Sequence, residues 1–486
     1  MPDYLTGFSE ATTDRLARWL LLAGLLVSIG FVFVTKNTYD TGDSFTHYLI
    51  ARSVPAHPIN LLHAWGKPFY TLLTAGPAQL GWRAVLLWQC GLVAASAWLS
   101  YQVARQLEVP YAGLAVLFCY AAPDYFRIQF SGLTEPLFGL VLVAGVYLAV
   151  AGRPGWSAAL VSWLPFVRSE GFMLLGVWAV YLTWQQQWRA LPWLALGYAT
   201  YSAIGVVVLG EAGWVFARNP YATVSPYGHG DWSTYVVGLL YLLGWVIGLL
   251  VVLGGASMLR RLANRARWAQ PSFQAELLLV YGCLAVFILA HTLFWRFGLF
   301  GSAGLTRVLA SQPPLLAVVA LRGLQLLAGL APTPAGRRRV VLGVGVATVL
   351  FLFTGLRMAF RWQRDFGENG DVTLARQAAG WYRHLPGPPR PAAVEQPAVA
   401  YALDLDRFDP RAAPKATVDR QLRLAELPVG ALVFWDENFS LGQEQLALAQ
   451  LAGNPHFRQR WAASTLRQAG DPGAGTTQLV VFEKIE

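Results

Sequence analysis

The sequence predicts an α-helical polytopic membrane protein, with about eleven transmembrane or half-membrane helices and a small C-terminal α/β domain. The residue types A, V, I, L, M, F, W, Y and C make up 55% of the 486 residues. Charged residues make up only 13%, about half of the ~25% that soluble domains carry. Residues 1–365 hold 38 charged side chains and residues 366–486 hold 26, so we expect the first part in the membrane and the second in water.

The net charge of +10 belongs to the membrane part, which has 25 basic and 13 acidic residues. Because the arginines border apolar runs, we attribute the excess to membrane topology and expect no nucleic acid as a partner. Cys90, Cys119 and Cys283 lie inside apolar runs, which predicts free buried thiols and offers neither a disulfide framework nor a zinc motif. The composition also argues against a secreted or disordered protein.

The first apolar run, residues 17–34, follows Arg15 and Arg18 and has no small-residue cleavage site after it. We expect an uncleaved anchor with a cytoplasmic N-terminus. A polar and aromatic stretch, residues 35–82, comes next and contains no continuous run that could cross a bilayer. Ten further apolar runs lie near residues 84–104, 111–123, 137–151, 156–167, 171–184, 190–209, 236–257, 277–295, 308–321 and 340–356.

Eleven spans are an odd number, which places the C-terminal part outside, and we expect a multi-pass protein of the plasma (inner) membrane. The arginine clusters 260–267 and 337–339 then fall inside, in agreement with the positive-inside rule. The total count, 13 Lys and Arg inside against 12 outside, is only a weak bias. The domain boundary is expected after residue 357, which gives a membrane domain over 1–357 and an α/β domain over 358–486.

Four of the apolar runs are shorter than the ~20 residues that cross about 30 Å of hydrocarbon, namely 111–123, 137–151, 156–167 and 171–184. They form two pairs, each joined by a polar segment. Helical hairpins that stop short of the outer surface would leave a water-filled vestibule there, since charged breaks in helices are tolerated only beside a cavity.

The C-terminal part shows mixed α/β patterns. Helices are expected at 371–384 and 442–451, strands at 398–405, 431–435 and 478–483, and a proline-rich connector at 386–397. No glycine-rich phosphate loop and no G-x-S-x-G motif occurs there.

The acidic residues of the membrane part are distributed unevenly. Seven of its 13 carboxylates fall on the proposed outer side, namely Asp40, Asp43, Asp124, Glu135, Glu170, Glu211 and Asp231. Carboxylates near hydrocarbon are costly and therefore point to function. On a helix that starts at Ser44, Asp43 and His47 would share a face. The pattern supports two interpretations of Asp43 equally, a helix N-cap or a catalyst.

The remaining candidates also have two interpretations each. Lys67, among aromatic residues, suits a phosphate as a compact charge, or is an interfacial lysine. Glu135 opens an apolar helix with ordinary helix-start chemistry, which does not explain why that helix starts so deep. Arg168 and Glu170 either serve a site or form an ion pair that closes a hairpin.

Two outer segments complete the set of candidates. Tyr227 and Asp231 lie in a loop whose aromatic residues suit a lid or a sugar-stacking surface, or an interfacial aromatic belt. Arg307 precedes an outer helix start, where backbone N–H groups also attract anions. We count His47, Tyr227 and Asp231 among the substrate-binding candidates.

Together these residues resemble a known family. The motif Asp40–Asp43 in a long first outer loop, Gly66-Lys67-Pro68, Thr134-Glu135-Pro136 and Arg168-Ser169-Glu170-Gly171 are similar to the GT-C superfamily of integral-membrane glycosyltransferases. The pattern is nearest the branch that uses polyprenyl-phosphate sugars, which includes protein mannosyltransferases and aminoarabinose transferases. The likeness covers about residues 15–357. Gly66-Lys67-Pro68-Phe69 departs from the Lys-Pro-Pro of the aminoarabinose transferases, so their substrate is not carried over.

The resemblance implies an inverting hexosyl or pentosyl transfer from a polyprenyl-phosphate donor to a hydroxyl of a lipid, glycan or protein, on the outer side of the membrane. Asp43 would be the general base, with Asp40 as the reserve candidate. Lys67, Arg168 and Arg307 would stabilise the charge of the leaving phosphate. Glu135 and Glu170 would orient sugar hydroxyls or those cations.

No cofactor is required under this hypothesis. Asp40, Asp43 and His47 are compatible with a divalent cation, Mg²⁺ or Mn²⁺, although a helix cap is the simpler explanation. The main alternative is a lipid or lipid-linked sugar transporter (a flippase), because short paired helices with charges also occur in transporters. Against it, the sequence shows no inverted repeat, and its carboxylates gather on the outer side.

Overall fold

The computed structural model describes residues 10–486 except 222, 354–359, 410–423, 443–444 and 467–474. The chain divides into two compact units. The membrane unit comprises residues 1–33, 62–73 and 83–360, and the α/β unit comprises residues 34–61, 74–82 and 361–486. Most of residues 35–82, the predicted first outer loop, therefore packs with the C-terminal part of the chain. The expected boundary after residue 357 lies outside the described residues.

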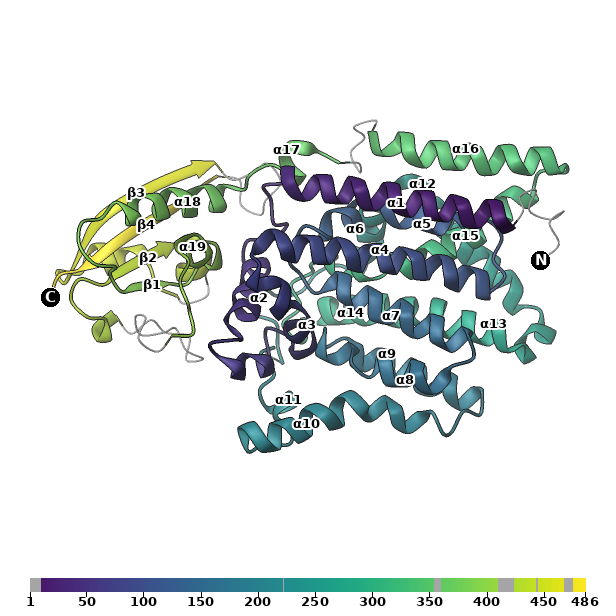
Figure 1. Cartoon of the computed structure of the whole chain (residues 1–486), viewed down its shortest axis with the longest axis horizontal. Coiled ribbons are helices and arrows are strands. Elements are labelled where there is room, and N and C mark those ends of the chain that lie inside the picture. Colours follow the sequence, from purple (N-terminus) through teal and green to yellow (C-terminus); the bar gives the residue numbers. More distant parts are fainter. Residues whose placement is uncertain (1–9, 222, 354–359, 410–423, 443–444, 467–474) are drawn as a thin grey trace. The chain divides into compact units, whose positions relative to one another are not determined.

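The membrane unit is helical, and its helices lie side by side in Figure 1. They are α1 (Glu10–Val34), α4 (Trp82–Gln106), α5 (Leu114–Tyr120), α6 (Pro123–Ile128), α7 (Glu135–Val150), α8 (Pro154–Val161), α9 (Gly171–Trp184), α10 (Leu196–Leu209), α11 (Trp214–Ala217), α12 (Thr234–Leu262), α13 (Pro271–Ala275), α14 (Cys283–Phe297), α15 (Pro313–Gly329) and α16 (Pro334–Phe353). Helix α3 (Pro68–Gln79) belongs to both units.

Each of the eleven apolar runs contains a helix, which confirms the predicted fold class. Among the described residues, five helical segments are long and apolar enough to cross a membrane, namely Glu10–Val34, Trp82–Gln106, Leu191–Leu209, Thr234–Leu262 and Pro271–Arg296. The runs expected to be short are short. Helix α5 has 7 residues, α8 has 8, α9 has 14 and α7 has 16. At 1.5 Å per residue, even α7 is only about 24 Å long, less than the hydrocarbon thickness.

Glycines allow the central helices α12 and α15 to approach closely. A Cβ on Gly254 of α12 would lie 2.1 Å from the carbonyl oxygen of Val319, and a Cβ on Gly323 of α15 would lie 1.9 Å from that of Leu250. Both positions are therefore closed to any side chain. In lipid, where water does not drive helix association, such close backbone packing is a main source of stability.

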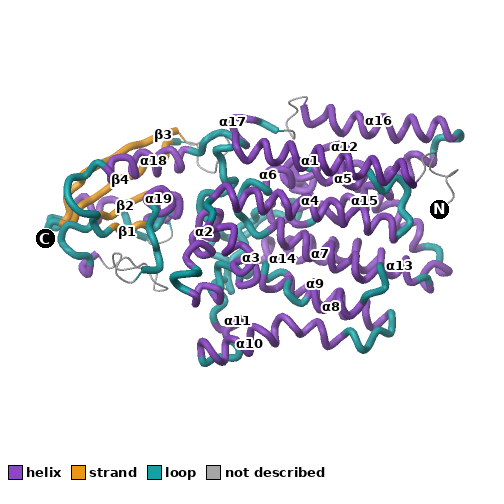
Figure 2. The backbone as a smooth tube through the Cα atoms, viewed as in Figure 1, coloured by secondary structure: helices purple, strands orange, loops and turns teal. Residues whose placement is uncertain are grey.

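The α/β unit contains α2 (Asp43–Ser53), α17 (Trp362–Asp365), α18 (Gly370–Arg383), β1 (Ala392–Val394), α19 (Pro397–Leu403), β2 (Leu432–Asp436), α20 (Leu448–Ala452), β3 (Phe457–Leu466) and β4 (Thr476–Lys484). The strands form one sheet in the order β1-β2-β4-β3, shown in orange in Figure 2. Strand β1 pairs with β2 in parallel, and the other pairs are antiparallel.

The predicted helix at 371–384 and the strands at 431–435 and 478–483 are confirmed as α18, β2 and β4. The predicted strand at 398–405 is wrong, because Pro397 sits at the first helical position and most of these residues belong to α19, which ends at Leu403. The predicted connector 386–397 contains β1. Of the predicted helix at 442–451, the described residues form only α20. Strand β3 was missed because its largely exposed, polar residues lack an apolar run.

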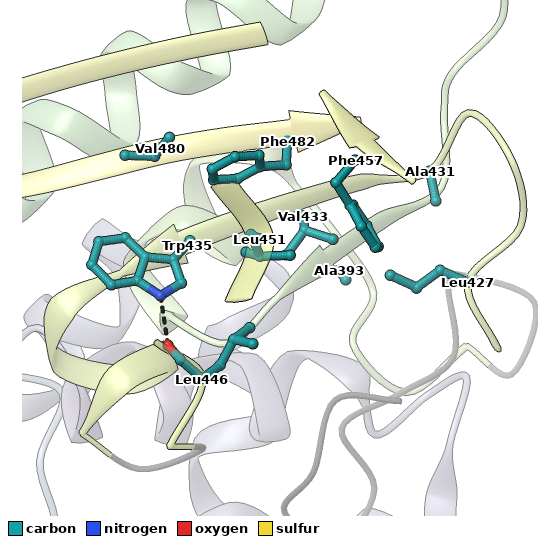
Figure 3. Close-up of a cluster of buried hydrophobic side chains, with 10 residues drawn as sticks. All are labelled: Ala393, Leu427, Ala431, Val433, Trp435, Leu446, Leu451, Phe457, Val480 and Phe482. Carbon is teal, nitrogen blue, oxygen red and sulfur yellow. Dashed lines mark hydrogen bonds between the residues drawn. The ribbon is translucent and has the colours of Figure 1, made fainter. Parts of the chain in front are cut away.

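The sheet carries its own hydrophobic core. Trp435 and Val433 of β2 pack with Phe482 of β4 and with Leu451, and the indole Nε1 of Trp435 donates a hydrogen bond to the Leu446 carbonyl at 2.7 Å (Figure 3). Helix α18 adds a stripe of buried side chains, namely Leu374, Ala375, Ala378 and Ala379. The indole hydrogen bond leaves no polar group of Trp435 unsatisfied in this core.

Asp436, at the end of β2, is expected to make stability depend on pH. Burial raises its pKa to about 6, although three backbone N–H groups that bind the carboxylate oppose the shift. Because the folded-state pKa lies above the unfolded value of about 3.9, the protonated form stabilises the fold at low pH. This contribution, of the order of 3 kcal/mol, is lost as the pH rises through 6.

The difference in the free energy of unfolding between wild type and Asp436→Asn isolates the contribution of the Asp436 carboxyl. Asparagine keeps an oxygen that accepts hydrogen bonds from the turn, but it does not titrate. Between pH 4 and pH 7 the free energy of unfolding of wild type should fall relative to that of the variant. Denaturant unfolding at both pH values measures it, and parallel pH profiles would show that Asp436 has an ordinary pKa.

Candidate functional site

A buried group of charges in the membrane unit joins three of the predicted residues. Arg168, in the turn before α9, places Nη1 2.7 Å from Oε1 of Glu135 and Nη2 2.8 Å from Oε1 of Glu170. Its Nη1 also donates to the hydroxyl of Thr134 at 3.1 Å. Glu135 begins α7, and its side chain is only 1% exposed. The predicted Arg168–Glu170 ion pair exists. The same guanidinium also binds the carboxylate of Glu135, which lies 33 residues earlier in the chain.

Lys67 lies beside this group. Its ammonium donates to the hydroxyl of Ser169 at 3.3 Å and stands 4.6 Å from the centre of the Tyr221 ring. The side chain is buried, and the backbone has a positive φ of 61°, a conformation that costs energy in a residue other than glycine. Lys67 therefore meets protein groups and an aromatic face. We call Lys67, Glu135, Arg168 and Glu170 the charged cluster; it holds two formal charges of each sign.

The turn before α7 is held by two residues that the sequence analysis missed. Gln89 of α4 accepts the N–H of Gly132 at 3.0 Å and donates to the carbonyl of Leu133 at 2.6 Å. The hydroxyl of Tyr70 donates to the carbonyl of Gly132 at 2.6 Å. These bonds fix the start of α7 and hence Glu135. A glutamine inside an apolar span was the signal that could have revealed Gln89.

His291 of α14 is a further residue that sequence reasoning missed. Its Nε2 lies 3.6 Å from Oε1 of Glu170, and its side chain is buried against Phe287 and Tyr235, at ring distances of 4.6 and 5.5 Å. A buried histidine in the apolar run 277–295 was the available signal. His291 connects the long apolar segment Pro271–Arg296 to the charged cluster.

The structure separates the charged cluster from a second buried group in the same unit. Glu276 receives two N–H bonds from Arg261 and two from Arg322, so both of its oxygens are saturated. In contrast, Oε2 of Glu135 is buried and has no hydrogen-bond partner among the described residues. Because buried polar atoms are normally paired, Glu135 stays a candidate for binding a ligand.

The other candidates of the membrane unit lie as follows. Arg307 is half-buried in the helical turn Thr306–Ser311, ahead of α15. Tyr227 and Asp231 are exposed, and no contact described for either side chain reaches the charged cluster. From the same loop it is Tyr221 that meets Lys67, and Tyr221 also lies 5.8 Å from the ring of Trp65. The expectation of an aromatic contribution from this loop thus applies to Tyr221.

The acidic motif belongs to the α/β unit. Oδ1 of Asp40 accepts the backbone N–H groups of Gly42 and Asp43, both at 2.8 Å, at the start of α2. Gly42 occupies the N-cap position and Asp43 is the first helical residue, so the interpretation of Asp43 as the N-cap is wrong. Asp43 is half-buried, and His47, four residues later on the same face of α2, is buried. Asp40 therefore has a structural task.

Across the described residues, no group of three or more His, Cys, Asp or Glu side chains is arranged to hold a metal ion.

The fold and the charged cluster define a class: a multi-pass membrane protein with a buried group of charges at the ends of half-membrane helices. Neither a protein-family model nor a curated protein sequence matches the chain. Solved structures, in contrast, match the chain in fold. The crystal structure of ArnT from Cupriavidus metallidurans, bound to undecaprenyl phosphate, has a TM-score of 0.57 at 13% identity, over 97% of this chain and 98% of that one.

An oligosaccharyltransferase from Archaeoglobus fulgidus, tethered to an acceptor peptide, gives a TM-score of 0.44 at 12% identity, over 76% of this chain and 57% of that one. The similarity to ArnT over 97% of the chain shows that this protein shares the fold of ArnT, which is the GT-C fold that its motifs predicted.

Proposed function

We propose that the protein is an inverting glycosyltransferase that moves a sugar from a polyprenyl-phosphate donor to an acceptor hydroxyl on the outer side of the plasma membrane. The observation that carries this proposal is the charged cluster, in which the buried Lys67 donates to Ser169, next to Arg168, and Arg168 holds a buried carboxylate with a spare oxygen. The fold supports it, since the ArnT structure with that fold holds undecaprenyl phosphate.

The cluster suits a phosphate that leaves with the lipid. In the proposed reaction the acceptor oxygen forms a bond to the anomeric carbon, the bond from that carbon to the phosphate oxygen breaks, and polyprenyl phosphate departs as an anion. Lys67 and Arg168 stabilise the charge that develops on it, with Arg307 as a third candidate. Because the leaving group is already a stable anion, no strong general acid is needed.

The carboxylates have different tasks in this proposal. Asp43 takes the proton of the acceptor hydroxyl as its oxygen attacks, which is the work of a general base. Asp40 accepts the backbone N–H of Asp43 and in this way supports it. Glu170 orients Arg168, and Glu135 holds Arg168 with one oxygen while the other accepts a sugar hydroxyl.

Binding and turnover test the proposal in separate steps. The purified protein in detergent should bind undecaprenyl phosphate, and Lys67→Met should weaken that binding at least about tenfold, because one charge-assisted contact is lost. Lys36→Met, at an exposed lysine, is the control and should bind as wild type does. Equal binding by Lys67→Met would remove Lys67 from the phosphate site.

Turnover is measured with polyprenyl-phosphate sugars in detergent, with EDTA, Mg²⁺ or Mn²⁺ added in parallel. Release of polyprenyl phosphate coupled to glycosylation of an acceptor supports a transferase. Movement of the lipid-linked sugar across the membrane of sealed vesicles, without transfer of the sugar to an acceptor, would instead identify a transporter.

A further inference from the structure

We infer that the C-terminal part of the α/β unit, residues 361–486, is the element that positions the candidate base, with Phe439 and Asp371 as positioning residues. This inference rests on the proposed function. It assigns a task to a part of the chain whose sequence shows no catalytic motif.

Asp371 ties the acidic motif to the sheet. The hydroxyl of Thr41 donates to Oδ2 of Asp371 at 3.3 Å, and the hydroxyl of Thr477 on β4 donates to Oδ1 at 3.0 Å. Asp371 lies in the first turn of α18, where the side-chain oxygen of Asn369 accepts the backbone N–H of Asp371 at 2.9 Å. The carboxylate thus bridges the segment before α2 and strand β4.

Phe439 packs against Gly42, which lies between Asp40 and Asp43 in the sequence. A Cβ on Gly42 would lie 2.8 Å from Cζ of Phe439, so the ring fills the place of the missing side chain. Phe439 itself is held in the turn Glu437–Leu441, where Asp436 accepts the N–H groups of Asn438, Phe439 and Ser440 at 2.9, 2.8 and 3.4 Å. The sheet therefore carries a fixed support for Gly42.

A third contact holds the body of α2. The ring of Tyr401 on α19 stacks on Phe45 at 4.6 Å and meets Tyr48 edge-on at 5.5 Å. In the last turn of α2, Arg52 pairs with Asp404 at 2.5 Å. Helix α2 is therefore held at its start, along one face and at its end by residues of the C-terminal part.

These contacts matter because α2 cannot fix its own geometry. It has 11 residues, and isolated helices below ~12–15 residues are marginal in water. A catalytic group that moves by about 1 Å can lose of the order of 10²-fold in rate. The supports on Gly42 and Thr41 therefore set the position of Asp43 rather than touching any substrate.

Phe439→Ala in the full-length protein is the test. We expect kcat to fall about 10- to 100-fold while KM for the donor stays unchanged, since the phosphate contacts are not altered. Phe439→Leu, which keeps apolar bulk, should recover most of the rate. Leu441→Ala, an exposed residue of the same turn, is the matched control and should keep the wild-type kcat.

The effect should also depend on Asp43. If Phe439 acts through Asp43, then Asp43→Asn should reduce kcat by less in the Phe439→Ala background than in wild type. Fully additive losses, or a wild-type kcat in Phe439→Ala, would overturn the inference.

Hydrogen exchange separates this inference from the proposed function. The amides of residues 42–48 should exchange faster in Phe439→Ala than in wild type. In Leu441→Ala they should exchange at the wild-type rate. If wild type shows no turnover on any polyprenyl-phosphate sugar, the proposed function fails, and the exchange result alone decides whether the C-terminal part holds α2. Unchanged exchange in Phe439→Ala would refute the support of Gly42 by Phe439.

Discussion

Asp43→Asn should lower the rate of sugar transfer by about 10²–10⁴-fold, the range that one general base supplies. Asparagine matches aspartate in shape but cannot accept the proton of the acceptor hydroxyl. Asp43 is the first residue of α2 and is only half-buried, so the loss of its charge near the helix N-terminus should cost at most about 1 kcal/mol of stability. The measurement is kcat of the purified variant, with its unfolding midpoint as a check on folding.

Asp40→Asn is the matched control for that variant. The amide oxygen of asparagine can still accept the N–H groups of Gly42 and Asp43, so the start of α2 and most of the activity should persist. A larger loss in Asp40→Asn than in Asp43→Asn would make Asp40 the base. Wild-type turnover in Asp43→Asn would exclude Asp43.

Arg168→Gln should destabilise the membrane unit by about 3–5 kcal/mol, because it leaves Glu135 charged and buried without its cation. Removing that carboxylate charge as well, in Glu135→Gln/Arg168→Gln, should restore part of the stability. Double-mutant analysis of unfolding in detergent measures the coupling between the two residues. Transfer activity should be absent from both variants, since the proposed phosphate contact is gone from each.

An exposed ion pair provides the comparison. Arg218 and Glu211 lie 3.2 Å apart with side chains 51% and 37% exposed, and Arg218→Gln should cost less than about 1 kcal/mol. If Arg168→Gln is no more destabilising than Arg218→Gln, the charged cluster is not the buried network described above.

The charged residue types of the candidate site were visible in the sequence, but of their pairings only Arg168–Glu170 was. Lys67, Glu135, Arg168 and Glu170 stand out because charges are rare in apolar surroundings. Their contacts join segments far apart along the chain, such as Lys67 to Ser169, and sequence spacing carries no information about such distances. Gln89 and His291 were missed because a single polar residue within an apolar run is more often a satisfied core residue.

The position of the acidic motif shows the same division. The sequence left the cap and the catalyst interpretations of Asp43 equal, and only the folded backbone shows that Asp40 accepts the N–H groups at the start of α2. Likewise, residues 398–405 fit a strand by composition, since a short apolar run fits either structure. Their packing as α19, with Tyr401 against Phe45, decided in favour of the helix.

By itself the sequence determined the membrane class, the eleven apolar runs, the short helices and the chemical types available for a site. These are local properties, because the transfer of a helix into lipid depends on the summed hydrophobicity of about 20 neighbouring residues. The tertiary structure decided which charges pair, which carboxylate keeps a spare oxygen, and which residues support α2. Those features depend on distances between remote segments, which only the packing of the whole chain sets.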